Sequence, residues 1–205
     1  MTCAISNILI RKGETFTRII RWEAQPLVSK AITAITKAYP AVVTSAAHGI
    51  PDGWRAAILS AGGMEEINAE VEVLGELPKA SEFYKINKLT DDTISLPEVN
   101  STEFTTYTSG GYLVYLSPVD LDGMTARLQI RASKNATGDP LLELTSADSE
   151  IVLDNTEKTI TITIAASVTE DLSFVKGYYD LEILSGDVVT RLLEGPVVVD
   201  GEVTR

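Results

Sequence analysis

Cysteine and histidine are nearly absent from this 205-residue sequence, which holds one of each, Cys3 and His48. A lone cysteine cannot form a disulfide within the chain, so cysteine usage gives no indication of an oxidising compartment. Zinc takes three or four protein ligands, and no further Cys or His is present to complete such a set. The sequence therefore predicts no metal site and no bound cofactor.

Basic residues are also scarce, with 17 Lys and Arg against 29 Asp and Glu and a formal net charge of -12. Such a chain repels nucleic-acid phosphates and anionic lipid unless basic residues gather locally, and no basic patch is visible. No apolar run approaches the ~18 residues that cross a bilayer, and no basic segment precedes an apolar run at the N-terminus. We expect no nucleic-acid partner, no membrane insertion and synthesis in the cytoplasm.

What the sequence does contain is alternation of apolar and polar residues, which is typical of strands with one buried face. Isoleucine alternates with threonine in residues 159–164, and apolar residues alternate with polar ones in residues 124–131. Residues 178–184 and 188–199 are predicted to form a hairpin, and residues 15–22 a strand whose neighbours lie a hundred residues later. With no sustained helical periodicity, the chain is predicted to be all-β, of sandwich or barrel type.

One short helical turn is predicted between the strand at 159–164 and the hairpin. Ser167 and Glu170 have the spacing of a capping box, in which the serine begins the helix. The turn is too short to form a layer of its own.

Composition changes in the middle of the chain. From about residue 31 to about residue 115, short strand candidates are separated by turns rich in Gly, Pro, Asn and Asp. Six glycines in these turns are predicted to adopt positive φ; they are Gly49, Gly53, Gly62, Gly63, Gly110 and Gly111. This region is predicted to be a separate small β-module.

The turns of this region occur in an ordered set: His48-Gly49, Gly63-Met64 with Asn68, Asp92-Thr93 with Leu96, and Tyr107 with Ser109-Gly110-Gly111. In this order they resemble a small β-barrel module that is repeated in many bacteriophage tail proteins. That module is similar in fold to the first catalytic-cysteine half-domain of ubiquitin-activating enzymes. The chain lacks adenylation and cysteine machinery, so the resemblance implies no ubiquitin chemistry.

The flanking segments resemble a second phage family, a tail or baseplate-associated β-domain. The resemblance is carried by "RKGETFTRIIRW" near the start and by "SPVDLDGMTARLQIRAS", "TITITIAA", "GYYDLEI" and "VVTRLLEGPVVV" later. In that family a short turn joins the first of these segments to the second, and here the module occupies that turn. The resemblance implies an immunoglobulin-like β-sandwich from residues 1–27 and 117–205, with a small β-barrel of residues 28–116 inserted.

Candidate catalytic groups are few. His48 has no Ser or Cys nucleophile motif near it in the sequence, and we expect its ring to hydrogen-bond the backbone of its turn. The carboxylate pairs Asp91-Asp92, Glu65-Glu66 and Asp148 with Glu150 are interpreted as solvated, although a glycosidase pair or calcium ligands remain alternatives. The chain is predicted not to be an enzyme.

Aromatic residues make up 6% of the chain. Trp22 and Trp54 could offer a face for stacking on sugars, although core packing is the favoured interpretation. Tyr107, Tyr112 and Tyr115 lie close together near the end of the central region. Trp54, Tyr107 and Tyr112 are the residues we predict as contacts for a partner or a glycan.

These observations lead to three hypotheses. The resemblance implies a structural virion protein of a phage tail tip or baseplate, made in the bacterial host cytoplasm and then part of the virion tail. It would act as an adaptor for tail fibres or neighbouring tail proteins, through exposed strand edges and as a homo-oligomer in a symmetric assembly. The alternative is a receptor- or carbohydrate-binding module at the distal end of the tail, with host-surface glycan as ligand. The third hypothesis is a hydrolase.

Overall fold

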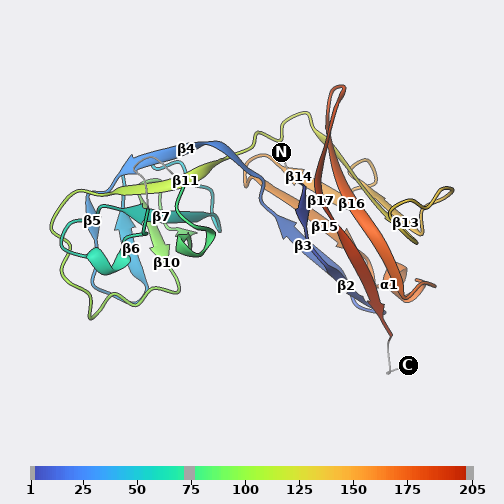
Figure 1. Ribbon diagram of the computed structural model, residues 1–205, viewed down its shortest axis with the longest axis horizontal. Helices are drawn as coiled ribbons and strands as arrows, with labels where there is room; N and C mark the ends of the chain where they lie inside the picture. The colour runs from blue at the N-terminus through green and yellow to red at the C-terminus, as the bar shows by residue number, and fades with distance from the viewer. Residues whose placement is uncertain (1–2, 72–76, 202–205) are drawn as a thin grey trace. The chain divides into compact units, whose positions relative to one another are not determined.

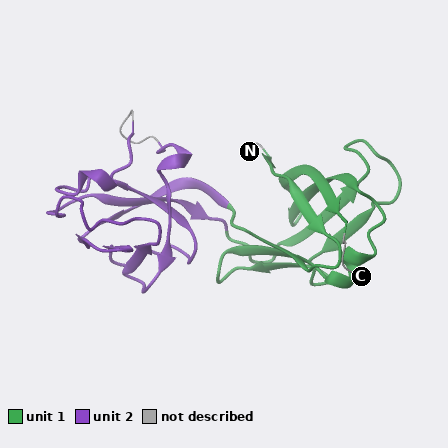
Figure 2. Ribbon diagram, turned by 90° about the horizontal axis from the view of Figure 1, so that it is seen from below, with its two compact units in different colours: residues 1–22, 120–205 green, residues 23–119 purple. Residues whose placement is uncertain are grey.

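The computed structural model describes residues 3–71 and 77–201, and strands make up nearly all of its regular structure (Figure 1). This confirms the predicted all-β class. The chain divides into two compact units, unit 1 of residues 1–22 and 120–205 and unit 2 of residues 23–119 (Figure 2). The resemblance implied boundaries between residues 27 and 28 and between residues 116 and 117.

In unit 1, residues 3–22 and 120–201 form two sheets. The larger has the strand order β1-β17-β16-β12-β13, with β2 also paired to β17, and the smaller has the order β14-β15-β3. Its elements are β1 Ala4–Ile5, β2 Ile8–Arg11, β3 Phe16–Ile20, β12 Thr125–Arg131, β13 Leu142–Thr145, β14 Ile151–Asp154, β15 Thr159–Ile164, α1 Ala166–Glu170, β16 Lys176–Ser185 and β17 Val188–Asp200.

The alternation of apolar and polar residues along the strands determines which face of each sheet is buried. Ile160, Ile162 and Ile164 of β15 are buried, while the threonines between them are half-buried. The strand predicted near the start of the chain is β3, and it pairs with β15 across about 140 residues of sequence, with Ile20 opposite Ile160. Both predictions, the strand and its distant neighbour, are confirmed.

The predicted hairpin is formed by β16 and β17, joined at Gly186-Asp187, and Gly186 has a φ of 56°. The register shifts between Leu181 and Glu182, which is a bulge of the kind that strengthens strand twist. On its other side β17 pairs in parallel with β1 and β2, so the first strands of unit 1 lie beside its last. The sequence patterns did not predict this parallel pairing.

The predicted helical turn exists as α1, but the capping box is wrong. The N-cap is Ala165, and no side chain caps the helix, so Ser167 lies inside the helix. The hydroxyl of buried Thr169 instead donates a hydrogen bond to the carbonyl of Glu14 at 2.8 Å. A tertiary contact therefore holds this short helix, in place of the local cap.

The described residues of unit 2 also form two sheets, each of four strands, in the orders β5-β6-β10-β9 and β4-β11-β7-β8. Its strands are β4 Glu23–Ala31, β5 Ala34–Ile35, β6 Ala41–Thr44, β7 Arg55–Leu59, β8 Tyr84–Lys85, β9 Asn87–Lys88, β10 Thr93–Leu96 and β11 Tyr112–Pro118. Two short 3-10 turns, Glu65–Ile67 and Ala80–Glu82, complete its regular structure among the described residues.

The core of unit 2 lies between these sheets and includes Trp54, Ile58, Leu96 and Leu113. A second, smaller cluster joins Ala57, Ala69 and Val114. Because neighbouring residues of β7 and β11 point to opposite faces, the sheet β4-β11-β7-β8 is covered by apolar side chains on both sides.

Candidate functional site

His48 lies in the interior of unit 2, with none of its surface exposed. Its Nδ1 accepts a hydrogen bond from the backbone N–H of Ile50 at 3.0 Å, and its Nε2 lies 3.0 Å from the carbonyl oxygen of Thr90. An amide N–H can only donate and a carbonyl can only accept, so the proton is on Nε2. The prediction that this ring binds the backbone of its turn is confirmed, and the ring presents no atom to solvent for catalysis.

The hydroxyl of Tyr115 donates a hydrogen bond of 2.5 Å to the carbonyl of His48. Burial raises the pKa of this tyrosine above its usual range, so the hydroxyl keeps its proton and remains a donor. The ring and the carbonyl of His48 therefore join strand β11 to the turns that follow β6 and β9.

Asn68 closes a second turn of unit 2. Its Oδ1 accepts from the backbone N–H of Ala61 at 2.8 Å and its Nδ2 donates to the carbonyl of Ala61 at 3.1 Å, as a paired strand would. Next to this clamp the backbone of Gly62 exchanges hydrogen bonds with Thr108 and Ser109, at 2.8 and 2.9 Å. Asp92 closes a third turn, where its Oδ1 accepts from the N–H of Ala47 at 2.7 Å.

The glycines of these turns divide into two groups. Gly49, Gly53, Gly63, Gly110 and Gly111 have positive φ, as predicted. Gly62 does not, and the prediction for it is wrong. A Cβ at Gly62 would lie 2.8 Å from the carbonyl oxygen of Ser109, so this position requires glycine because two backbone segments approach closely.

The three predicted contact residues occupy different environments. Trp54 is 1% exposed, and its Nε1 donates to the carbonyl of Leu116 at 3.0 Å. Its ring therefore offers no face to a sugar or partner, which corrects its assignment as a contact and confirms the core interpretation. The hydroxyl of half-buried Tyr107 lies within 3.1 Å of the carbonyls of Ile32 and Gly110, where it ties backbone together. Tyr112, on β11, is 51% exposed.

The carboxylates considered as acids or metal ligands mostly support turns. Asp148 and Glu150 accept hydrogen bonds from the hydroxyl and the N–H of Thr145, at 2.7 and 2.9 Å, and so shape the turn between β13 and β14. Hydrogen bonds from backbone N–H groups, its own and that of Thr105, hold the pKa of Glu66 below its usual range. Among residues 3–71 and 77–201, no group of three or more His, Cys, Asp or Glu side chains could hold a metal ion.

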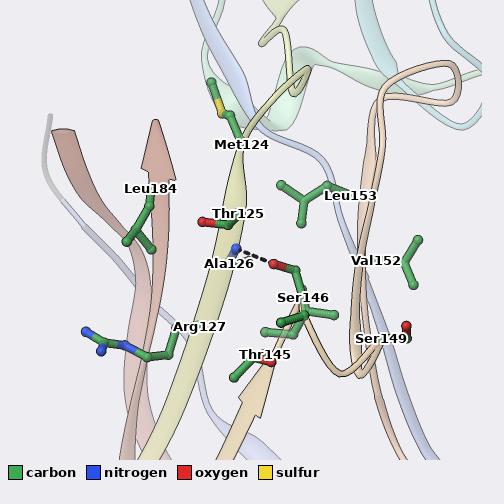
Figure 3. A pocket seen from close by; sticks show the side chains of 12 residues that line it. Met124, Thr125, Ala126, Arg127, Thr145, Ser146, Ser149, Val152, Leu153 and Leu184 are labelled. Atoms are coloured by element: carbon green, nitrogen blue, oxygen red, sulfur yellow. Dashed lines mark hydrogen bonds between the residues drawn. The ribbon is translucent and has the colours of Figure 1, made fainter. Parts of the chain in front are cut away.

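A cavity of about 610 Å³ lies in unit 1, along the start of β12 where β13 ends and the chain passes to β14 (Figure 3). Its walls consist mainly of aliphatic side chains and of the hydroxyl-bearing side chains of Ser and Thr. The lining includes Met124, Thr125, Thr145, Ser149, Leu153 and Leu184. Within it the backbone N–H of Ala126 donates to the Oγ of Ser146 at 3.0 Å. Arg127 is the one titratable side chain of the lining, so the lining contains no acid–base pair.

The surface of the larger sheet that faces away from the core of unit 1, here called the outer face, carries a network of ion pairs. Arg127 donates to Glu182 at 2.8 Å, and Arg191 lies 3.3 Å from Asp180 and 3.5 Å from Glu194. Lys134 contacts Glu194 at 2.7 Å and lies 5.3 Å from the centre of the Tyr178 ring. Side chains on strands remote in sequence thus meet across this face.

The pKa values of two cross-strand neighbours in this network are shifted in opposite directions. Asp180 lies opposite Glu194 in the register of β16 and β17. Burial raises the pKa of Asp180 above its usual range, and this outweighs the attraction of Arg191. A hydrogen bond from Lys134 holds the pKa of Glu194 below its usual range. Burial thus disfavours the charged form of Asp180, whereas the hydrogen bond from Lys134 favours the charged form of Glu194 beside it.

The outer face was not among the predicted candidate sites. The charged residues of β12, β16 and β17 were visible as the polar half of an alternating pattern, which is also the pattern of any solvated face. A signal was available in the N-terminal segment, where Leu9 alternates with apolar residues that are buried. This pattern indicates an apolar surface only when combined with the pairing of β2 and β17.

A scan against models of protein families finds no match to this chain, and a search of curated proteins finds none either. In the part of the chain that the structure describes, no helix is long and apolar enough to cross a membrane.

Proposed function

We propose that this chain is a structural virion protein of a bacteriophage tail tip or baseplate, where it acts as an adaptor for tail fibres or neighbouring tail proteins. One observation carries the proposal. The residues on which the resemblance of the central segment rests are the ones that close its turns, His48, Asn68, Asp92 and Tyr107 among them. The resemblance therefore involves residues that determine the fold of unit 2, and a chance match at surface positions would not have this property.

The arrangement of strands supports the immunoglobulin-like assignment of unit 1. Its larger sheet places the last two strands, β17 and β16, beside β12, while β3 and β15 belong to the other sheet. Immunoglobulin-like sandwiches likewise group their last two strands with a middle strand in one sheet and place an early strand in the other, which supports the assignment. Unit 2 begins with β4 and ends with β11, which pair with each other, so the inserted segment leaves and returns at neighbouring points, with Glu23 opposite Pro118.

The chemistry of the surfaces favours binding over turnover. The cavity along β12 in unit 1 has aliphatic and hydroxyl walls, and His48 is enclosed by backbone. The ion pairs of the outer face favour contact with another protein, because paired charges lose less hydration energy than single charges when a partner covers them. An adaptor requires surfaces of this kind.

The proposal is tested on particles of the phage that encodes the chain. Antibody raised against the purified protein and coupled to gold should label the tip of the tail, and mass spectrometry of purified particles should detect the chain. The same antibody pre-absorbed with the protein provides the control. Absence of the chain from purified particles, or labelling confined to the head, would contradict the proposal.

The alternative of a receptor- or carbohydrate-binding module now depends on Tyr112, because Trp54 is buried and Tyr107 binds backbone. A glycan array tests it. If the alternative holds, the wild-type chain binds a glycan, Tyr112→Ala loses that binding, and Tyr39→Ala, a change at another exposed tyrosine of unit 2, retains it. Binding that survives Tyr112→Ala, or no binding at all, rejects this alternative.

A further inference from the structure

An apolar strip crosses one end of the outer face. Leu9 of β2 lies in register with Val198 of β17, and the two side chains are 51% and 40% exposed. Pro196 is two residues from Val198 on the same face, and it lies opposite the exposed Tyr178 of β16. These four residues are called the strip below, and register makes them contiguous.

Ile5 extends the strip along the edge of the sheet. It is 76% exposed and pairs with Glu194, two residues along β17 from Pro196. An isolated exposed apolar residue is ordinary, but a contiguous group bordered by polar residues is typical of a surface that another protein covers. The ion pairs of Glu194 with Lys134 and Arg191 form that border.

The outer face differs from the chain as a whole in its charge. Its six strands contribute five basic and five acidic side chains; these are Arg11, Arg127, Arg131, Lys176 and Arg191, and Glu143, Asp180, Glu182, Glu194 and Asp200. The whole chain, by contrast, has 17 basic and 29 acidic residues. The excess negative charge therefore lies elsewhere on the molecule.

We propose that the outer face, centred on the strip, is the surface through which two copies of this chain associate about a two-fold axis. A second copy brings the same balanced set of charges, so two such faces meet without net repulsion. At most other surfaces two copies would bring like charges together, because each carries a net charge of -12. The strip supplies apolar area, and the paired charges around it restrict the orientation.

This inference shares with the proposed function the expectation of a homo-oligomer and so deepens it. Its test requires only the purified chain. Failure to find the chain in phage particles and failure of the chain to associate are therefore separate results.

The experiment is sedimentation velocity of the full chain from roughly 1 to 300 μM, a range that covers weak association as well as moderate. We expect the wild type to shift from monomer to dimer as concentration rises. Leu9→Glu combined with Val198→Glu should weaken association about 100-fold or more, because the contact would then bury four unpaired carboxylates. A wild type that stays monomeric throughout this range overturns the proposal.

The matched control lies on the other sheet of unit 1. Ile19 and Val152 are exposed on the outward side of β3 and β14, where Thr161 of β15 separates them in register. Ile19→Glu combined with Val152→Glu adds the same charge to unit 1 and should leave association within about 2-fold of wild type. If this control dissociates the dimer and the strip variant does not, the outer face is the wrong surface.

Two further measurements keep the test decisive. Thermal unfolding should show that both double variants are folded, and amide exchange in β2 and β17 of the wild type should slow as its concentration rises. Increasing salt from about 0.05 to 0.3 M should preserve or strengthen association, because screening reduces the repulsion between two acidic chains. Association that salt abolishes, or exchange in β2 and β17 that does not depend on concentration, contradicts the proposed contact.

Discussion

The two units use their polar side chains in opposite ways. In unit 2, side chains such as His48, Asn68 and Tyr107 turn towards backbone groups and close the loops between short strands. In unit 1, the polar side chains of long strands mostly pair with each other on the outer face. Short strands provide few ladder hydrogen bonds, so unit 2 depends on its turns, whereas unit 1 depends on its register.

The largest expected effect concerns two adjacent glycines of unit 2. Gly111 and Gly110 both have positive φ, but a Cβ at Gly111 would lie 2.8 Å from the Cα of Ala61, whereas at Gly110 it meets only the Ser60 oxygen at 3.8 Å. Gly111→Ala should destabilise unit 2 by about 3 kcal/mol or more and Gly110→Ala by about 1 kcal/mol. Denaturant unfolding of the two variants measures the difference. Equal losses would show that backbone conformation, and not the close approach, requires glycine here.

The next effect tests the buried histidine. His48→Ala leaves the N–H of Ile50 and the carbonyl of Thr90 without partners in the interior, and should cost about 3 kcal/mol. Tyr115→Phe removes one donor and keeps the ring, and should cost about 1 to 2 kcal/mol.

Peptide-resolved amide exchange of the full chain locates these losses. In both variants we expect faster exchange in residues 23–119 and unchanged exchange in residues 120–200, because all strand pairs of unit 2 lie within the unit. Equal acceleration in both units would show that they unfold together, and would contradict the view that turns hold one unit and register the other.

A smaller effect depends on pH. Burial raises the pKa of Asp180, so between its ordinary value and that raised value the folded chain holds a proton that the unfolded chain releases. Ionisation of this carboxyl therefore opposes folding. Asp180→Asn should raise the stability of unit 1 at pH 7, and the gain should disappear as pH falls below about 4. Thermal unfolding of dilute protein across this range is the measurement.

The contrasting variant is Glu194→Gln, since a hydrogen bond from Lys134 holds the pKa of Glu194 below its usual range. The folded-state pKa is then the lower one, so the stabilisation by the carboxylate is present at neutral pH and is lost as pH falls through that value. Glu194→Gln should therefore lower stability at pH 7 and leave it unchanged in acid. Shifts of the same sign in both variants would contradict the assigned causes.

The smallest effect is expected from an exposed ion pair. Arg127→Ala removes the contact with Glu182, and the side chain of Arg127 is half exposed. Such pairs contribute about 0.5 kcal/mol or less. A loss in chemical denaturation comparable to that of His48→Ala would mean that surface charges hold unit 1 together, and the contrast between the units would be wrong.

Much of the fold could be predicted because strand alternation is a local property. The alternation of threonine and isoleucine in residues 159–164 identifies the buried face of that strand. The turn between β16 and β17 identifies their hairpin. The parallel pairing of β1 with β17 could not be predicted in this way, because Ala4 and Leu193 are distant in sequence and no turn connects them. The capping box failed since Thr169 binds Glu14, a contact made only in the folded state.

The candidate site was harder to predict than the fold. The role of His48 followed from the absence of catalytic partners, and the structure confirms it. Trp54 was ambiguous because a tryptophan beside a turn has the same local sequence whether its ring packs inward or faces solvent. Leu9 and Val198 come together through the pairing of β2 with β17. The alternation of residues within either strand does not reveal this pairing.

The pairing of β1 and β2 with β17 also affects the order in which the protein can form during synthesis. Every strand of unit 2 has left the ribosome once residue 119 has, whereas β1 must wait for its partner at residues 193–194. At roughly 5 to 20 residues per second, about ten seconds or more separate the translation of β1 from that of its partner. Throughout that interval β1 and β2 lack the strand with which they pair, and the larger sheet can be completed only after β17 has been made.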